Sequence, residues 1–172
     1  IDVLSEGRLL PGFGIGSPQG PEWQALGIDT KTRGRRTDEA LEIIGRLWRE
    51  DGVTFEGRHF RLRDASISPR PTRDDLPMWI GGGTEAAIRR TARYGTGWQA
   101  GAELPAEAGR IVAAIKAAAA EIGRTIDGDH YGAAFPFYFG DRESAVMSGA
   151  MAAYARRTGR DPTKYFAVGD AA

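Results

Sequence analysis

The sequence predicts an α/β fold in which short apolar strands alternate with amphipathic helices. The strand-like run at residues 77–80 meets a helical stretch through a glycine turn, and this alternation recurs about four times along the chain. Each helix is long enough to cross back over a sheet, which favours parallel strands with right-handed crossovers. About four β-α units fit either a doubly wound sheet or roughly half of a (β/α)8 barrel, since a closed barrel needs about 200 residues or more.

Composition predicts one domain covering residues 1–172, with 41% hydrophobic residues to form its core. The 23 basic and 23 acidic residues balance, so we expect neither nucleic acid nor an anionic membrane as a partner. The chain has no cysteine and two histidines, which argues against disulfides and a nitrogen-ligated metal site. It shows no membrane-spanning run and no secretory signal, so we expect a cytoplasmic location. Because it begins with isoleucine, we expect it to be part of a longer protein.

The first half of the chain shows one clear helix between less regular segments. Residues 8–15 suggest a short strand, which Pro11 and Gly12 weaken, and residues 17–21 form a loop. The spacing predicts a helix over 31–50, with one apolar stripe formed by Ala40, Ile43, Ile44, Leu47 and Trp48. Residues 53–62 suggest a small hairpin or an irregular excursion instead of a core strand, and the three prolines of 66–77 indicate an extended crossover.

The second half of the chain alternates more regularly. Strands are expected at 78–80, 97–100 and 131–139, and helices at 84–94, 105–122 and 142–154. Thr84 is the expected N-cap of the first of these helices. The buried stripe of the second is expected to be Ile111, Ile115, Ala118 and Ile122, and the third is expected to face inward through Met147, Met151 and Tyr154. The tail from 161 to 172 has the composition of a loop and includes Val168-Gly169-Asp170.

The glycine turn Gly81-Gly82-Gly83-Thr84 is the strongest candidate binding motif. Glycine allows the backbone to approach a phosphate closely, Thr84 adds a hydroxyl, and the following helix presents its positive end. The alternative is an ordinary tight turn in which Thr84 only caps the helix. The residues alone do not favour one interpretation over the other.

A second glycine motif, G-F-G-I-G at 12–16, does not predict a dinucleotide site. The spacing is G-x-G-x-G instead of G-x-G-x-x-G, and the prolines and glycine at 18–21 prevent the immediate helix that the dinucleotide fingerprint requires. Gly14 and Gly16, with Ser17 beside them, could form a bed for a flat ring at a strand end. The alternative is close packing of strand and loop.

Polar and aromatic residues elsewhere give weaker indications. Gln99 ends a strand and could hydrogen-bond a ligand, whereas Trp98 could serve the site or the core. His59 and His130 are expected to be solvated, not catalytic. The arginines Arg33, Arg35 and Arg36 are expected on a solvated helix face. No general acid or base emerges from the sequence.

Several short motifs occur in a characteristic order from residue 1 to about 124. They are I-D-V-L-S-E-G-R at 1–8, G-F-G-I-G at 12–16, R-G-R-R at 33–36 with D-E-A at 38–40, L-W at 47–48, F-E-G at 55–57, P-R-P at 69–71, P-M-W-I-G-G-G at 77–83, and A-R-Y-G at 92–95 with G-W at 97–98. In this ordered series the chain resembles the luciferase-like monooxygenase family. The similarity continues more thinly through 168–170.

The resemblance implies a (β/α)8 TIM-barrel enzyme that binds FMN or coenzyme F-420, a deazaflavin, at the carboxyl ends of its strands. By that resemblance the chain is a partial barrel, which starts just before the fourth strand and stops before the eighth. The expected strands are then the fourth at 8–15, the fifth at 78–80, the sixth at 97–100 and the seventh at 131–139. Cofactor contacts are expected from Gly14, Gly16, Ser17, Gly81, Gly82, Gly83, Thr84, Trp98 and Gln99, with the phosphate at the glycine turn.

The resulting functional hypothesis is a flavin-type oxidoreductase or monooxygenase acting on a small organic substrate. The cofactor would carry the hydride or oxygen chemistry, which is consistent with the lack of an obvious acid or base. The alternative is a non-catalytic, truncated barrel module. Its open strand edges would favour association with other chains, including a homo-oligomer.

Overall fold

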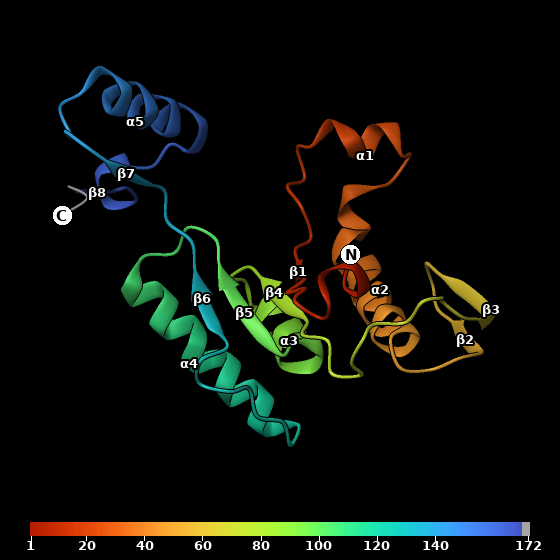
Figure 1. Cartoon of the computed structure of the whole chain (residues 1–172). Helices are drawn as coiled ribbons and strands as arrows, with labels where there is room; N and C mark the ends of the chain where they lie inside the picture. The colour runs from red at the N-terminus through yellow and green to blue at the C-terminus, as the bar shows by residue number, and fades with distance from the viewer. Residues whose placement is uncertain (170–172) are drawn as a thin grey trace.

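The computed structural model describes residues 1–169, which form five α-helices and eight short strands (Figure 1). In chain order the elements are η1 (Val3–Ser5), β1 (Gly12–Phe13), α1 (Pro21–Ala25), η2 (Thr30–Thr32), α2 (Arg33–Leu47), β2 (Val53–Glu56), β3 (Arg61–Ala65), β4 (Trp79–Gly81), α3 (Glu85–Tyr94), β5 (Gly97–Ala100), α4 (Pro105–Glu121), β6 (Tyr131–Ala133), β7 (Phe137–Phe139), α5 (Ala145–Thr158), η3 (Pro162–Lys164) and β8 (Ala167–Gly169). None of the helices in this range is both long and apolar enough to cross a membrane.

The centre of the fold is a four-stranded parallel sheet in the order β1-β4-β5-β6. Phe13 pairs with Ile80, and Ile80 in turn pairs with Trp98 of β5. Helices α3 and α4 return the chain between successive strands, as parallel pairing requires. The predicted α/β class with a mainly parallel sheet is therefore confirmed.

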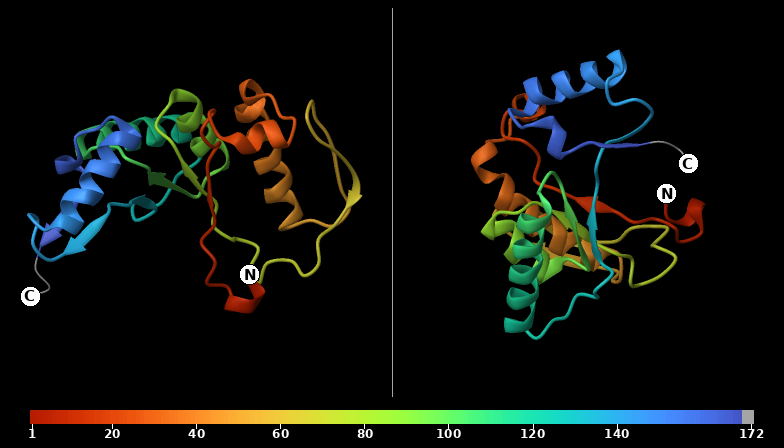
Figure 2. Two further views of the ribbon diagram at one scale, coloured as in Figure 1. Left: turned by 90° about the horizontal axis from the view of Figure 1, so that it is seen from above. Right: turned by 90° about the vertical axis from the view of Figure 1, so that its left-hand side faces the viewer.

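One face of the sheet packs against helices through large apolar side chains. Trp98 is 1% exposed and packs with Ile111 and Ile115 of α4, while Ile80 packs with Leu41 of α2. Figures 1 and 2 show α2, α3 and α4 in a row along this side of the molecule. Full burial of each such side chain stabilises the fold by about 1.5–3 kcal/mol relative to exposure.

The buried faces of α2 and α4 differ slightly from those predicted. Leu41 is 1% exposed and was missing from the predicted stripe, because the core-facing side of α2 runs through 41, 44 and 48. On α4, Ala119 is buried instead of Ala118, and Ile122 lies beyond the last turn and is 54% exposed. The short helix α1 was not predicted at all.

The antiparallel hairpin β2-β3 projects from α2 at the right of Figure 1, which confirms the predicted hairpin. Its turn is held by Glu39 of α2, whose carboxylate accepts the backbone N–H groups of Arg58, His59 and Phe60 at 2.9–3.0 Å. Burial by itself would raise the pKa of Glu39, but these donors hold it below its ordinary value. The Glu39 carboxylate thus anchors the hairpin to the helix.

The carboxyl end of α3 is closed by a distant arginine. The guanidinium of Arg124, just after α4, donates to the backbone carbonyls of Ala92 and Gly95, the latter at 2.9 Å. A cation is favourable at this end because the last carbonyls of a helix lack partners within it and carry partial negative charge. Arg124 therefore joins the ends of two neighbouring helices.

The predicted strand at 131–139 is wrong as a single element. Residues 131–133 form β6 and pair with β5, whereas 137–139 form β7 and pair with β8. Pro136 separates the two and has no N–H to donate to a ladder. The expected loop at the tail contains β8, and Asp170 lies outside the described residues. With α5, the β7-β8 pair forms a lobe beside the sheet (Figure 1).

Candidate functional site

The carboxyl ends of the four parallel strands meet at one edge of the sheet, which we call the carboxyl edge. β1 ends beside β4 because Phe13 pairs with Ile80, so Gly14 follows β1 close to Gly81. The turn at 82–84 and the loop at 101–103 leave the same edge from β4 and β5. Functional residues of parallel α/β proteins gather at this edge. The register thus brings the two predicted glycine motifs together.

Near the carboxyl ends of the strands, the face of the sheet opposite the helices carries glycines and one amide side chain. Alternation along the strands places Gly81, Gln99 and Gly132 side by side on this face, next to one another by register. A Cβ on Gly132 would come within 2.8 Å of Gln99 Oε1, and one on Gly81 would lie 3.6 Å from the Gln99 carbonyl oxygen. The result is a glycine strip in which Gly81 stays open, while the Gln99 amide and the Trp79 ring fill the side-chain space of Gly132. Gly132 was not predicted, although glycine inside a strand is itself a signal.

Trp79 forms the part of this face nearer the amino ends of the strands. Its ring covers Gly97 and Gly132, where a Cβ would come within 2.5 and 2.7 Å of ring atoms. The buried indole Nε1 of Trp79 has no hydrogen-bond partner among residues 1–169. Both glycines are therefore required by the packing of Trp79, a residue with no predicted role.

The glycine turn has the geometry that a close backbone approach requires. Gly82 has φ +107°, a conformation that favours glycine, and a Cβ on Gly83 would lie 2.6 Å from Ile111. Thr84 caps α3 as predicted, its hydroxyl accepting the Ala87 N–H at 3.3 Å. Within the described chain, the N–H groups of Gly83 and Thr84 donate no hydrogen bond. The turn therefore combines free donors with the positive end of a ten-residue helix.

Trp98 supports the turn from the core instead of facing the carboxyl edge. Its indole Nε1 donates to the Gly82 carbonyl oxygen at 2.9 Å, and its ring is enclosed by the α4 cluster. Of the two interpretations of Trp98, the structure therefore shows the core role. This corrects its placement among direct cofactor contacts, because its side chain points to the opposite face from Gln99.

The remaining predicted site residues lie at or after the ends of β1 and β5. Gln99 donates from Nε2 to the Ala100 carbonyl at 3.2 Å. Gly16 has φ +70°, and a Cβ there would contact the ring of Trp23 at 3.0 Å. Ser17 is exposed and its hydroxyl donates to Gln19 Oε1 at 2.6 Å. Gly14, in contrast, has open space on its Cβ side.

The two histidines and the arginines Arg33 and Arg36 of α2 make contacts within the fold. His130 lies at the opposite, amino-terminal edge, with Nδ1 2.8 Å from the Thr96 carbonyl oxygen. His59 lies in the hairpin turn, and its Nε2 is buried without a hydrogen-bond partner in the described chain. Arg33 donates to the Thr30 carbonyl, and the Arg36 guanidinium stacks on Phe60 at 4.9 Å. His59, His130, Arg33 and Arg36 are half-buried, so the expectation that they are solvated is wrong; Arg35 is exposed as expected.

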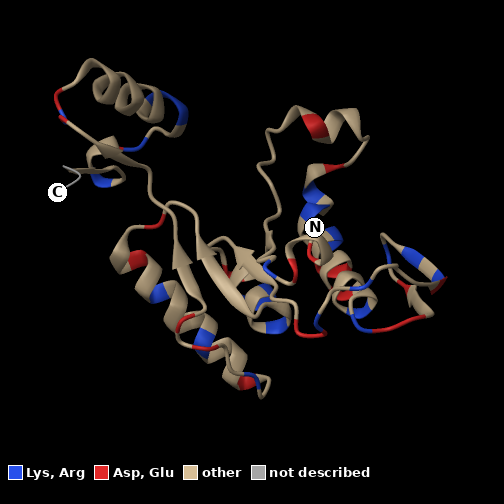
Figure 3. Cartoon of the chain, viewed as in Figure 1, with Lys and Arg blue, Asp and Glu red and all other residues tan. Residues whose placement is uncertain are grey.

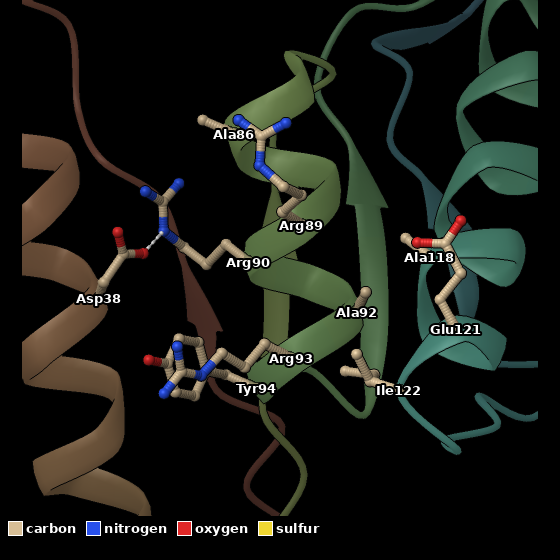
Figure 4. A pocket seen from close by; sticks show the side chains of 10 residues that line it. All are labelled: Asp38, Ala86, Arg89, Arg90, Ala92, Arg93, Tyr94, Ala118, Glu121 and Ile122. Atoms are coloured by element: carbon tan, nitrogen blue, oxygen red, sulfur yellow. Dashed lines mark hydrogen bonds and ion pairs between the residues drawn. The ribbon is translucent and has the colours of Figure 1, made fainter.

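A cavity of about 440 Å³ lies on the helix side and not at the carboxyl edge (Figure 4). It is lined by α3 from Ala86 in its first turn to Tyr94 at its end, by the end of α4 and by Asp38 of α2. Arg90, 4% exposed, donates from Nε to Asp38 at 2.6 Å in this cavity. Figure 3 shows basic and acidic residues interspersed along these helices. The pair Arg90–Asp38 joins α3 to α2, so we assign this cavity a structural role.

A smaller cavity, of about 260 Å³, opens at the carboxyl edge. Gly101 and Ala102 after β5 form one wall, and residues 134–136 after β6 form another. The lobe containing α5 supplies Tyr154, Arg157, Thr158 and Tyr165. The cavity is therefore mostly apolar and aromatic with one arginine, a composition typical of small-molecule sites.

Comparisons with known proteins identify relatives of this chain. The sequence profile of the family described as luciferase-like monooxygenase matches residues 1–170. An uncharacterised protein of Mycobacterium tuberculosis is 35% identical over 115 residues, which are 66% of this chain and 39% of that protein. An F420-dependent glucose-6-phosphate dehydrogenase of Segniliparus rotundus is 30% identical over 133 residues, 71% of this chain and 39% of that enzyme. The chain thus spans about two fifths of the length of these relatives.

Solved structures share the fold. The monooxygenase RslO1 from Streptomyces bottropensis has a TM-score of 0.75 and 25% identity, covering 91% of this chain and 49% of that one. An F420-dependent secondary alcohol dehydrogenase, solved with an F420–acetone adduct, has a TM-score of 0.78 at 18% identity, covering 97% of this chain and 58% of that one.

Proposed function

The chain belongs to the luciferase-like monooxygenase family, and on that premise we propose that it is the cofactor-binding part of an oxidoreductase dependent on coenzyme F-420 or FMN. The observation that carries the proposal is the meeting of the glycine turn and the glycine strip at one carboxyl edge. When bound, such a cofactor supplies hydride transfer or, with FMN, oxygen activation.

The residues of this chain would bind and orient the cofactor. A phosphate fits the free N–H groups of Gly83 and Thr84, because the positive end of α3 favours an anion there. A flat ring could lie against the backbone of Gly81 and Gly14, since no Cβ stands in its way. Gln99 would hydrogen-bond one edge of that ring.

A small organic substrate would occupy the 260 Å³ cavity of the carboxyl edge. Tyr154 and Tyr165 would cover an apolar body, and Arg157 would hold an acidic or carbonyl group. The wall of the cavity formed by Gly101 and Ala102 directly follows Gln99 and Ala100 of β5. A bound substrate would therefore lie next to the cofactor ring.

We further propose that the sheet is part of a (β/α)8 barrel with about four β-α units. The parallel order β1-β4-β5-β6, with helices packed on one face, supports this proposal. The similarity to structures that are about twice as long also supports it.

Cofactor titration tests the proposed site directly. The chain is titrated with FMN and with coenzyme F-420 while absorbance and fluorescence are followed, and Gly14→Val is compared with Gly128→Val. Neither glycine has an atom within 4 Å of its Cβ position, so both variants should fold. Gly14→Val should weaken ring binding at least tenfold, whereas Gly128→Val, before β6 at the opposite edge, should not. Failure of the unaltered chain to bind either cofactor would refute the proposal.

The exposed phenylalanines of β7 favour a second candidate function, association with another chain. Phe137 and Phe139 are 69% and 65% exposed and contact each other edge to face at 5.3 Å between ring centroids. Exposed apolar clusters of this kind mark interaction surfaces. Sedimentation velocity of the chain tests this alternative, and a monomer at all concentrations would exclude self-association.

A further inference from the structure

Glu103 places a carboxylate directly beside the glycine turn. It lies in the loop between β5 and α4, one residue before the N-cap Leu104. Its Oε2 accepts the backbone N–H groups of Gly101 and Ala102 at 2.6 and 3.0 Å. Its Oε1 lies 3.3 Å from the position that a Cβ on Gly83 would take. A negative group of this chain thus already occupies backbone donors at the carboxyl edge.

Among the described residues Glu103 forms no direct ion pair, although the Arg160 guanidinium donates to the carbonyl oxygen of neighbouring Ala102. None of the salt bridges formed within residues 1–169 involves Glu103, and its side chain is half-buried. Instead, it is held by neutral N–H donors close to the first turns of α3 and α4. Backbone N–H donors of this kind would also hold a phosphate at the glycine turn. The phosphate and the Glu103 carboxylate would then repel each other, because both are negatively charged.

We propose that Glu103 determines how strongly the glycine turn discriminates between ligands by charge. The proposal rests on the phosphate site suggested above. With the carboxylate in place, a doubly charged phosphate monoester meets repulsion that a neutral ligand with the same ring does not. Glu103 therefore limits the preference for phosphorylated ligands, and removing its charge increases that preference.

FMN and riboflavin, which differ only by the phosphate, provide the test. Both are titrated by fluorescence into the unaltered chain, into Glu103→Gln and into Glu107→Gln. The glutamine keeps the side-chain shape and one acceptor oxygen, so the loop after β5 keeps its support. Glu107 lies in the first turn of α4, is exposed and carries the same charge, which makes its variant the matched control.

In Glu103→Gln, the ratio of the riboflavin Kd to the FMN Kd should rise on the order of tenfold, as expected for repulsion between charges in a half-exposed site. The ratio in Glu107→Gln should stay within about twofold, because an exposed charge is screened. A purely structural role of Glu103 would change both affinities together and leave the ratio constant, which would overturn the proposal.

Two further outcomes are distinct. If FMN binds the unaltered chain and Glu103→Gln equally well, the charge role is wrong while the phosphate site stands. If no variant binds FMN or riboflavin, this inference fails, and the proposed function fails with it only if the unaltered chain does not bind coenzyme F-420 either. Glu103→Asp, which keeps the charge, should retain the ratio of the unaltered chain within about threefold even if the glutamine variant does not fold.

Discussion

Trp98→Phe tests whether the core of the fold holds the glycine turn in place. The substitution removes the indole N–H that donates to the Gly82 carbonyl at 2.9 Å and shortens a side chain that is 1% exposed. The lost hydrogen bond costs about 1 kcal/mol of unfolding free energy. The smaller ring leaves a cavity against Ile111 and Ile115, which adds about 1–2 kcal/mol. We expect a total loss of about 2–3 kcal/mol.

Urea unfolding followed by circular dichroism measures this loss. Trp23→Phe is the matched control, since the Trp23 indole also donates to a backbone carbonyl, that of Ser17 at 2.7 Å, but is only half-buried. The control should lose less than about 1 kcal/mol. Equal losses in the two variants would show that the burial of Trp98 does not matter, contrary to the packing described above.

Ligand titration separates the core role of Trp98 from its effect on the turn. If Trp98 fixes Gly82, folded Trp98→Phe should bind FMN several-fold more weakly under conditions where it is fully native. A large loss of stability with an unchanged FMN Kd would refute the idea that this hydrogen bond positions the turn.

Three other predictions concern the anchors and the exposed surface. Arg124→Met should reduce the unfolding free energy, measured in urea, by about 2–3 kcal/mol, because it leaves two carbonyls at the end of α3 without a charged donor. Arg110→Met is the control at an exposed arginine, and it should change the unfolding free energy by less than about 0.5 kcal/mol. Because the pKa of Glu39 is lowered in the folded state, its carboxylate stabilises the fold at pH above the ordinary pKa of 4.5, and this stabilisation is lost as pH falls through the lower folded pKa. The fall in Tm between pH 6 and pH 3 should therefore be smaller in Glu39→Gln than in the unaltered chain. An identical fall in both would contradict the lowered pKa. The double variant Phe137→Ser and Phe139→Ser should reduce any concentration-dependent sedimentation of the chain, and unchanged sedimentation would place the contact elsewhere.

The secondary structure of the central region could be predicted closely from the sequence. The strand at 97–100 has the predicted bounds, and α3 begins at the predicted cap Thr84. These elements have strong local signals, namely a glycine turn, a capping hydroxyl and helical periodicity. The split of 131–139 and the pairing of β7 with β8 could not be predicted, because a strand's partner is decided by segments far away in the chain.

The candidate site was predictable only in part, for the same reason. The two glycine motifs were recognisable, but a glycine in a printed sequence does not reveal which face of a sheet it occupies. The roles of Gly132 and Glu103 could not be predicted, because they depend on contacts with residues of other strands and loops. Trp98 could be assigned to the core only when its indole N–H was seen to reach Gly82.

By itself the sequence determined the α/β class, the sites of the main helices and the family to which the chain belongs, because these follow from local periodicity, caps and ordered motifs. Only the tertiary structure decided which glycines lie together, which tryptophan faces the core and which carboxylate stands beside the turn. The physical reason is that strand register and side-chain burial arise from contacts between distant segments, and a shift of one residue in register exchanges the two faces of a strand.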